Sequence, residues 1–326
     1  MTAPVALPEA PAILEIRHAV RAWLARHEPA GGVVVALSGG ADSLALAAAA
    51  VAEAPAVRAL VVDHRLQDGS GAVAAAAAAR ALTLGCAGAD VVAVDVTGPG
   101  GLEAAARTAR YAALDAGRHG RPVLLGHTLD DQAETVLLGL ARGSGGRSIR
   151  GMAEYDAPWG RPLLGVRRAT TRTACAELGL APYEDPHNSD PGFTRVRLRT
   201  EVLPLLEDVL GGGVAPALAR TAEHLREDGE VLDTLSRQAF ATARDGDDLL
   251  VERLTDVPVA VRRRVLRSWL HDRGAKSLTD RQLRAVDELV GRWRGQGGVA
   301  VGGGRPGVRL VASRRRGRLS TGFVND

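Results

Sequence analysis

The feature that most constrains the fold is an apolar run that leads directly into a glycine-rich turn. Val33 to Leu37 are five consecutive apolar residues, and Ser38-Gly39-Gly40-Ala41-Asp42-Ser43 follows without a gap. The next segment is rich in alanine and leucine, which favour helix. A strand, a tight turn and a helix in this order predict an α/β fold with the turn at the carboxyl edge of a parallel sheet.

The rest of the N-terminal half repeats this alternation. Continuous β-branched runs between helix-like segments predict a parallel sheet with helices on both faces. Further strands are predicted at Ala59 to Asp63, Val91 to Val96 and Pro122 to Gly126, and helices at Asp42 to Ala52, Gly71 to Gly85 and Leu102 to Ala116.

The pattern changes after Pro186, and the run Leu210-Gly211-Gly212-Gly213 is a strong helix breaker. Just before it, Leu198 to Leu206 is expected to be helical with a kink or restart at Pro204. We therefore predict an α/β domain at residues 1–210 and a smaller, mainly helical domain at 211–326. The second domain is expected to contain helices at Pro216 to Ala243, Val259 to His271 and Asp280 to Trp293, and short strands at Val299 to Val301 and Val308 to Val311.

Composition excludes several classes of protein. The longest apolar stretches, Leu44 to Ala52 and Ala72 to Ala79, are too short to span a bilayer. Met1 to Ile13 contain no basic region of a signal peptide, so we expect a cytoplasmic protein. Cys86 and Cys175 are too far apart in sequence for a C-x-x-C redox or zinc motif.

The glycine-rich turn has the chemistry of an anion site. Glycines let backbone amides approach a phosphate, the helix N-terminus favours negative charge, and Ser38 and Ser43 add hydroxyl donors. A kinase-type P-loop needs a lysine, whereas this turn carries Asp42, and Lys276 is the only lysine in the chain. A carboxylate here suits Mg²⁺ bridging the phosphates of a nucleotide. The run from Ser38 to Ser43 resembles the PP-loop of the ATP pyrophosphatases, and this resemblance implies cleavage between the α- and β-phosphates of ATP with transfer of AMP.

A second acidic position lies at the end of the next predicted strand. Asp63 and His64 come where ligands of open α/β sheets bind, so contact with the adenine or ribose is one interpretation. The alternative is that Asp63 only caps the turn that follows.

An acidic helix start follows the last predicted strand. Thr128 or Asp130 is expected to cap a helix whose Val136, Leu137 and Leu140 point inward. Asp131 and Glu134 are three residues apart, so they share one helical face. The two carboxylates could hold a cationic amine or a metal, or they could simply favour the helix dipole.

Taken together, the motifs resemble the tRNA(Ile)-lysidine synthetases in their short form. The resemblance covers roughly Gly32 to Leu206, and the chain departs from the usual family pattern at Arg65, where a glycine is usual, and at Val196, where an asparagine is usual. The matching segments are Ser38 to Ser43, Val62-Asp63-His64, Glu103 to Arg107, Ala109-Arg110-Tyr111, His127 to Thr135, Ala141 to Gly145, Glu184 to Asp190, Phe193-Thr194-Arg195 and Arg199.

The resemblance implies a reaction and its participants. ATP adenylates O2 of the wobble cytidine in tRNA(Ile) with a CAU anticodon, free L-lysine attacks C2, and AMP leaves. We expect ATP to contact Ser38 to Ser43, Asp63 and His64, and Mg²⁺ to bind at Asp42. We also expect Asp131 and Glu134 to hold the substrate lysine, and the alternative is that this pair binds magnesium. Arg195 or Arg199 is expected to orient the adenylate or the lysine carboxylate.

Arginines predict contact with nucleic acid. Residues 291–325 contain eight arginines and no acid, which indicates either a phosphate-binding surface or a solubilising tail. Only 3% of the chain is aromatic, so recognition is expected to use backbone charge and tRNA shape. The arginines of this segment are Arg292, Arg294, Arg305, Arg309, Arg314, Arg315, Arg316 and Arg318, and Arg142, Arg147, Arg150 and Arg199 are further candidates for tRNA contact.

Three other classes share part of this pattern. A PP-loop sulfur transferase generally needs paired cysteines, and a GMP- or NAD-forming amidating synthetase gives no reason for the basic segment. A tRNA-binding module with a degenerate nucleotide loop would not need the intact run from Ser38 to Ser43. Amino-acid-dependent release of AMP separates these alternatives. The sequence leaves open whether the chain forms a homodimer.

Overall fold

The computed structural model describes residues 7–98, 101–143, 145–303 and 307–325. It divides into an N-terminal unit, Met1–Arg142 with Gly151–Ala222, and a C-terminal unit, Gly143–Arg150 with Glu223–Asp326. The loop after the acidic helix thus belongs to the C-terminal unit. The functional division predicted at residue 210 stays a prediction.

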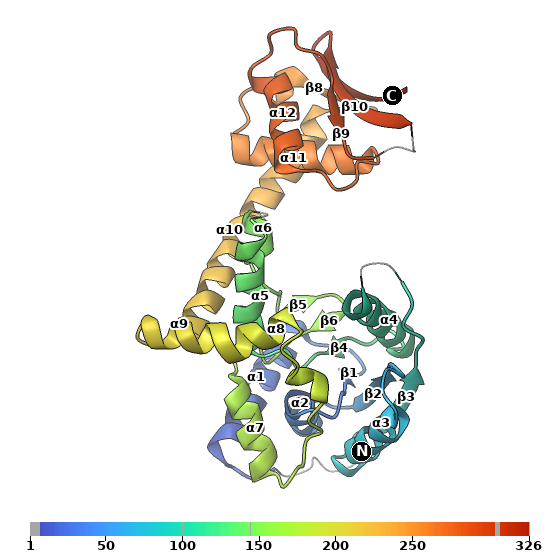
Figure 1. Cartoon of the computed structure of the whole chain (residues 1–326), viewed down its shortest axis with the longest axis vertical. Coiled ribbons are helices and arrows are strands. Elements are labelled where there is room, and N and C mark those ends of the chain that lie inside the picture. The colour runs from blue at the N-terminus through green and yellow to red at the C-terminus, as the bar shows by residue number, and fades with distance from the viewer. Residues whose placement is uncertain (1–6, 99–100, 144, 304–306, 326) are drawn as a thin grey trace. The chain divides into compact units, whose positions relative to one another are not determined.

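The N-terminal unit is built on a six-stranded sheet in the order β3-β2-β1-β4-β6-β5 (Figure 1). All neighbouring strands are parallel except β5 and β6, so the predicted parallel α/β sheet is confirmed. The strands are β1 (Val33–Ala36), β2 (Val57–Asp63), β3 (Gly88–Ala93), β4 (Val123–Leu124), β5 (Tyr155–Asp156) and β6 (Trp159–Gly160).

Successive side chains of β1 point to opposite faces of the sheet, and each face is covered by its own layer of helices. Val33 and Val35 pack into the larger core with α1, α2 and α7, while Val34 packs with Leu114 of α4 on the other face. The helices of this unit are α1 (Pro11–His27), α2 (Ala41–Glu53), α3 (Ser70–Thr83), α4 (Leu102–Gly117), α5 (Leu129–Ala141), α7 (Arg168–Glu177), α8 (Thr194–Arg197) and α9 (Leu203–Val209).

Helix α5 packs against the last part of the N-terminal unit. Its Ala133 lies in a small apolar cluster with Leu203 of α9 and Ala215 of α10 (Val214–Ala243). A π-helical turn, Leu198–Val202, precedes α9, whose first turn contains Pro204, so the predicted restart is confirmed. The prediction that Leu140 points inward is wrong, because its side chain is 51% exposed.

The C-terminal unit combines helices with a five-stranded antiparallel sheet in the order β7-β8-β11-β10-β9. Trp269 and Val286 pack against Leu310 and Leu319 of the sheet, which forms a second apolar core. The predicted helices are present, but the sheet is larger than the two short strands expected. The elements are α6 (Gly146–Ile149), β7 (Arg244–Asp245), β8 (Asp248–Leu250), α11 (Val259–Asp272), α12 (Asp280–Gly291), β9 (Val299–Val301), β10 (Val308–Arg315) and β11 (Arg318–Asn325), together with most of α10.

Within the described part of the chain, no single helix is both long and apolar enough to cross a membrane. The bent pair Thr194–Val209 and Val214–Ala243 meets the criterion jointly, by length and composition only.

Candidate active site

The glycine-rich turn is held in shape by its own serines. The Ser43 hydroxyl donates to the carbonyl of Gly40 at 2.9 Å, and the Ser38 amide donates to the Ser43 oxygen at 3.2 Å. Gly39 has φ +83°, a left-handed conformation that favours glycine. Gly40 is the N-cap of α2, so the helix starts at the turn where the sequence predicted it, and the free amides of its first turn face away from the helix body as they would in an anion site.

This turn forms one wall of a cavity of about 810 Å³ in the N-terminal unit. That volume is within the usual range for a nucleotide-sized ligand. Residues far apart in the sequence contribute to the lining because the carboxyl ends of β1, β2 and β4 meet at this edge. Among the predicted site residues, the cavity is lined by Ser38, Gly40, Ala41, Asp42, Ser43, Asp63, His64, Asp131 and Arg199.

Asp63 has the structural role that the sequence offered as an alternative. Its Oδ1 accepts a hydrogen bond from the amide of Arg65 at 3.0 Å, and this bond is the main cause that lowers the pKa of Asp63. Arg65 has φ +53°, which explains why glycine suits this position. Asp63 and His64 also both line the cavity.

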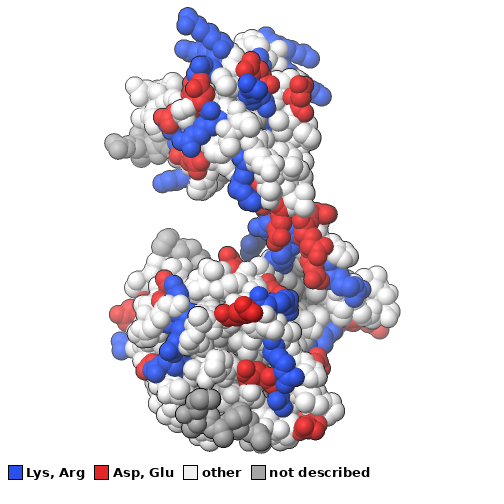
Figure 2. Space-filling view, turned by 180° about the vertical axis from the view of Figure 1, so that it is seen from behind, with Lys and Arg blue, Asp and Glu red and all other residues white. Residues whose placement is uncertain are grey.

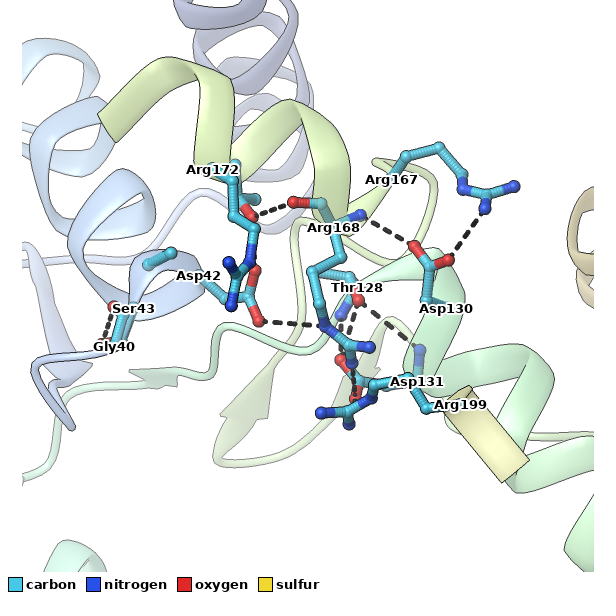
Figure 3. A network of polar contacts seen from close by, with 12 residues as sticks. Gly40, Asp42, Ser43, Thr128, Asp130, Asp131, Arg167, Arg168, Arg172 and Arg199 are labelled. Carbon is cyan, nitrogen blue, oxygen red and sulfur yellow. Dashed lines mark hydrogen bonds and ion pairs between the residues drawn. The ribbon is translucent and has the colours of Figure 1, made fainter. Parts of the chain in front are cut away.

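Arg168 at the start of α7 connects the two acidic motifs (Figure 3). Its Nη2 lies 2.5 Å from Oδ1 of Asp131, its Nη1 lies 3.3 Å from Oε1 of Glu134, and its Nε lies 3.5 Å from Oδ2 of Asp42. The sequence gives no signal for Arg168, because no local spacing relates it to acids 34 or more residues earlier. We call this group the acid–arginine cluster: Asp42, Asp130, Asp131, Glu134, Arg167, Arg168, Arg195 and Arg199.

Asp131 and Glu134 both reach Arg168, as their shared helical face predicts, but their environments differ. The Glu134 side chain is 0% exposed and accepts from Nε of Arg199 at 2.9 Å, while Nη1 of Arg195 lies 3.8 Å away. Glu134 is absent from the cavity lining, so a direct contact between Glu134 and a ligand is not supported. Asp131 is 15% exposed and lines the cavity.

Asp131 also completes a capping box at the start of α5. The Thr128 amide donates to Oδ2 of Asp131 at 2.8 Å, so Thr128 is the cap that the sequence offered beside Asp130. Burial acts to raise the pKa of Asp131, but Arg168 and the Thr128 amide outweigh it and hold that pKa below its ordinary value. Asp131 is therefore a charged carboxylate at the cavity wall.

Asp42 has a different electrostatic environment. Burial raises the pKa of Asp42, although the hydroxyl of Thr171 donates to it and Arg168 lies beside it. Among the described residues, no group of three metal-binding side chains is present. One or two carboxylates beside phosphate groups are nevertheless the usual protein contribution to a Mg²⁺ site, and Asp42 and Asp131 at the cavity wall fit that pattern.

The predicted tRNA-binding arginines of the C-terminal segment divide into two kinds. Arg314 donates to the carbonyl of Leu289 at 2.9 Å and lies over the Trp293 ring at 5.4 Å, so it stabilises the end of α12. Arg315 and Arg316 are exposed at the turn between β10 and β11. Basic side chains project from the surface of this unit (Figure 2). Arg305 lies outside the described residues.

Two of the arginines after the acidic helix share one acid. Arg147 lies 2.7 Å and Arg150 3.6 Å from Asp233 of α10, and Arg264 of α11 lies 3.1 Å from the same carboxylate. Three guanidinium groups around one carboxylate give this group of side chains a net positive charge. Arg142 is exposed at the end of α5, and Ser144 of the same motif lies outside the described residues.

A serine- and glycine-rich turn at the edge of a parallel sheet, with acids in place of a P-loop lysine, defines a PP-loop nucleotide-binding protein. In agreement, residues 14–206 match the PP-loop domain family, and residues 249–320 match the TilS substrate binding domain. The chain is 73% identical over 319 residues to the tRNA(Ile)-lysidine synthase of Rhodococcus opacus, which covers 97% of this chain and 98% of that protein. The enzyme of the same name from Nocardia farcinica is 71% identical over 307 residues, which are 94% of this chain and 96% of that protein. The one from Mycobacterium tuberculosis is 62% identical over 289 residues, which are 87% of this chain and 89% of that protein.

The chain therefore belongs to the tRNA(Ile)-lysidine synthase family, as its motifs indicated. It is a ligase-type enzyme, and the three rival classes are not supported. The U34-tRNA thiolase NcsA from Methanococcus maripaludis has a similar fold, with a TM-score of 0.54 at 19% identity over 66% of this chain and 80% of that one. At this identity the likeness shows the fold alone.

Proposed function

We propose that this protein adenylates O2 of the wobble cytidine in CAU-anticodon tRNA(Ile) and joins L-lysine to C2 of the same base. The observation that carries the proposal is that the phosphate turn and four members of the acid–arginine cluster, Asp42, Asp131, Arg168 and Arg199, line one cavity in a chain of this family. In the first step the cytidine oxygen bonds to the α-phosphorus and pyrophosphate leaves. In the second step the lysine ε-nitrogen bonds to C2, the C2–O bond breaks, AMP leaves, and the nitrogen gives up a proton. Because ATP and tRNA are its substrates, we place the enzyme in the cytoplasm.

For the first step, the turn Ser38 to Ser43 would bind the phosphates through backbone amides and serine hydroxyls. Asp42 would hold Mg²⁺, which when bound neutralises phosphate charge. Asp63 and His64, at the end of β2, would contact the ribose or adenine. The first 275 residues contain no lysine, so cationic groups near the phosphates must be arginines, and Arg168 and Arg199 both line the cavity.

For the second step, Asp131 would bind an amine of the substrate lysine. A charged carboxylate at the cavity wall matches a cationic ligand, and each of its oxygens can accept more than one hydrogen bond. Glu134, behind it, would position Arg199 and Arg168, and Arg195 would complete this support. Arg199 would then orient the adenylate or the lysine carboxylate.

Replacing Asp131 by asparagine should raise the lysine KM roughly 10- to 150-fold, because one charge-assisted hydrogen bond contributes about 1.5–3 kcal/mol. The ATP KM should change much less, since asparagine keeps an oxygen for the helix cap. Glu134→Gln is the matched variant: it lies one turn further along α5 but off the cavity, so it should not act on the lysine KM selectively. Recovery of the Asp131 variant by excess Mg²⁺ or Mn²⁺ would assign this carboxylate to the metal instead.

We further propose that residues 1–210 carry catalysis and that residues 211–326 bind tRNA phosphates through Arg315 and Arg316. Arg142 and Arg147, which precede the division at residue 210, would add further phosphate contacts. Each lost phosphate contact lowers the slope of log K against log salt by roughly 0.7–0.9. Replacing Arg315 and Arg316 together by alanine should therefore weaken tRNA binding and flatten the slope by roughly 1.4–1.8. Arg253→Ala removes another exposed arginine of the same unit and serves as control. An unchanged slope in the double variant would show that these two arginines are only solvated.

A further inference from the structure

The cavity contains a cation that the proposed mechanism does not use. Arg110 of α4 lines the cavity, and its Nε is buried without a hydrogen-bond partner. Among the described residues, no acidic side chain pairs with it, whereas Arg168 and Arg199 in the same cavity are paired with carboxylates. Its guanidinium carbon lies 5.6 Å from the centroid of the Tyr111 ring.

Two imidazoles line the same cavity as Arg110 and supply no countercharge. His64 and His127 also line the cavity, and Nδ1 of each is buried without a hydrogen-bond partner. Burial lowers the pKa of His127 to about 3, with Asp131 acting against this shift and Arg161, Arg110 and Arg107 adding to it. Burial also lowers the pKa of His64, and Arg110 adds to that effect. Both rings are therefore neutral at physiological pH.

A partly buried arginine of this kind lacks an anionic partner, which a ligand could supply. Burial lowers the pKa of Arg110, Tyr111 acts against this shift, and the nearby charges of Arg107 and Arg195 add to it. A guanidinium nevertheless stays protonated in proteins, so Arg110 is a partly desolvated cation for which the described residues supply no carboxylate partner. An oxyanion would supply the missing charge, and a planar carboxylate matches the fork of an arginine.

We propose that Arg110 binds the α-carboxylate of the amino-acid substrate in the cavity that His64 and His127 also line. The inference rests on the proposed function, which requires a free amino acid in this cavity. The α-carbon of an amino acid carries an amine and a carboxylate, so its site needs an acid and a cation close together. Asp131 and Arg110 supply this acid and this cation, because both line the same cavity. The phosphates of ATP, in contrast, have the amides and hydroxyls of the turn at Ser38 to Ser43.

The test compares L-lysine with L-lysinamide, in which a neutral amide replaces the carboxylate. The wild-type enzyme should show a KM at least tenfold lower for lysine than for lysinamide. Arg110→Gln should raise the KM for lysine at least tenfold and abolish this preference, while Arg110→Lys keeps part of it. Arg107→Gln is the matched control, because Arg107 lies one turn earlier on α4, is exposed, and bonds to the Tyr111 hydroxyl.

Three outcomes would overturn the inference. The first is an equal KM for lysine and lysinamide in the wild-type enzyme, which would show, without any variant, that the carboxylate is not bound. An equal rise for both amines in Arg110→Gln shows a general effect on the site. A rise confined to the KM for ATP or tRNA assigns Arg110 to a phosphate. A wild-type enzyme that forms no lysidine at all would instead refute the proposed function.

Discussion

Replacing Asp42 by asparagine should lower lysine-dependent formation of AMP by about 10²- to 10³-fold, the usual effect of removing one group that stabilises charge in a transition state. Asp42 lies in the first turn of α2 and lines the cavity beside the phosphate turn. Asparagine preserves the size of the side chain and an oxygen that can accept from Thr171, but it removes the charge that would hold Mg²⁺. Release of AMP from labelled ATP, with cognate tRNA and lysine present, measures the effect.

Thr171→Val is the control for this experiment. It removes the hydroxyl that donates to Asp42 but keeps the carboxylate and nearly the same buried volume. Its AMP formation should stay within about tenfold of the wild-type rate, on the scale of one ordinary hydrogen bond. Near wild-type activity of Asp42→Asn would show that the carboxylate takes no part in phosphate chemistry.

Replacing Arg168 by methionine should lower the free energy of unfolding by about 3 kcal/mol, the lower end of the range for breaking a buried ion pair. Arg168 is the shared partner of Asp42, Asp131 and Glu134, and its side chain is only 15% exposed. Methionine fills much of the same volume, so the main loss is the charge. Arg199 still pairs with Glu134, which keeps the effect from being larger. Urea unfolding at neutral pH measures the difference.

The same comparison has an expected pH dependence. Arg168 helps hold the pKa of Asp131 below its ordinary value, so this stabilisation is present above that ordinary value and is lost as the pH falls through the folded-state value. The deficit of Arg168→Met should therefore be full at neutral pH and shrink in acid. Arg172→Met, which breaks an exposed pair with Glu184, should cost less than about 1 kcal/mol. An equal loss of unfolding free energy in both variants would contradict the claim that Arg168 holds the acid–arginine cluster together.

Local sequence signals account for the parts of the site that lie within one element or at its end. The apolar run before Ser38 predicted β1 and the N-terminus of α2, and the three-residue spacing of Asp131 and Glu134 placed both acids toward one arginine. Matching motifs also predicted the family correctly.

Features that depend on tertiary packing could not be predicted in this way. Arg168 begins α7, a helix with three threonines in ten residues and little apolar periodicity, so neither the helix nor its partners stood out. The burial of Glu134 depends on Arg168 and Arg199 approaching from other segments. Arg314 looked like its basic neighbours, and only the packing of β10 against α12 directs it to the carbonyl of Leu289.

The most direct measurement is the mass of the tRNA nucleosides after the enzyme has acted. The enzyme is incubated with ATP, Mg²⁺, L-lysine and tRNA(Ile) carrying a CAU anticodon, and the digested tRNA is analysed by mass spectrometry. We expect lysidine in place of the wobble cytidine, together with AMP and pyrophosphate in equal amounts. Without lysine, no lysidine or AMP should form, and the pyrophosphate released should not exceed that from a single adenylation of each tRNA. An unmodified wobble cytidine, or release of ADP in place of AMP, would contradict the proposed function.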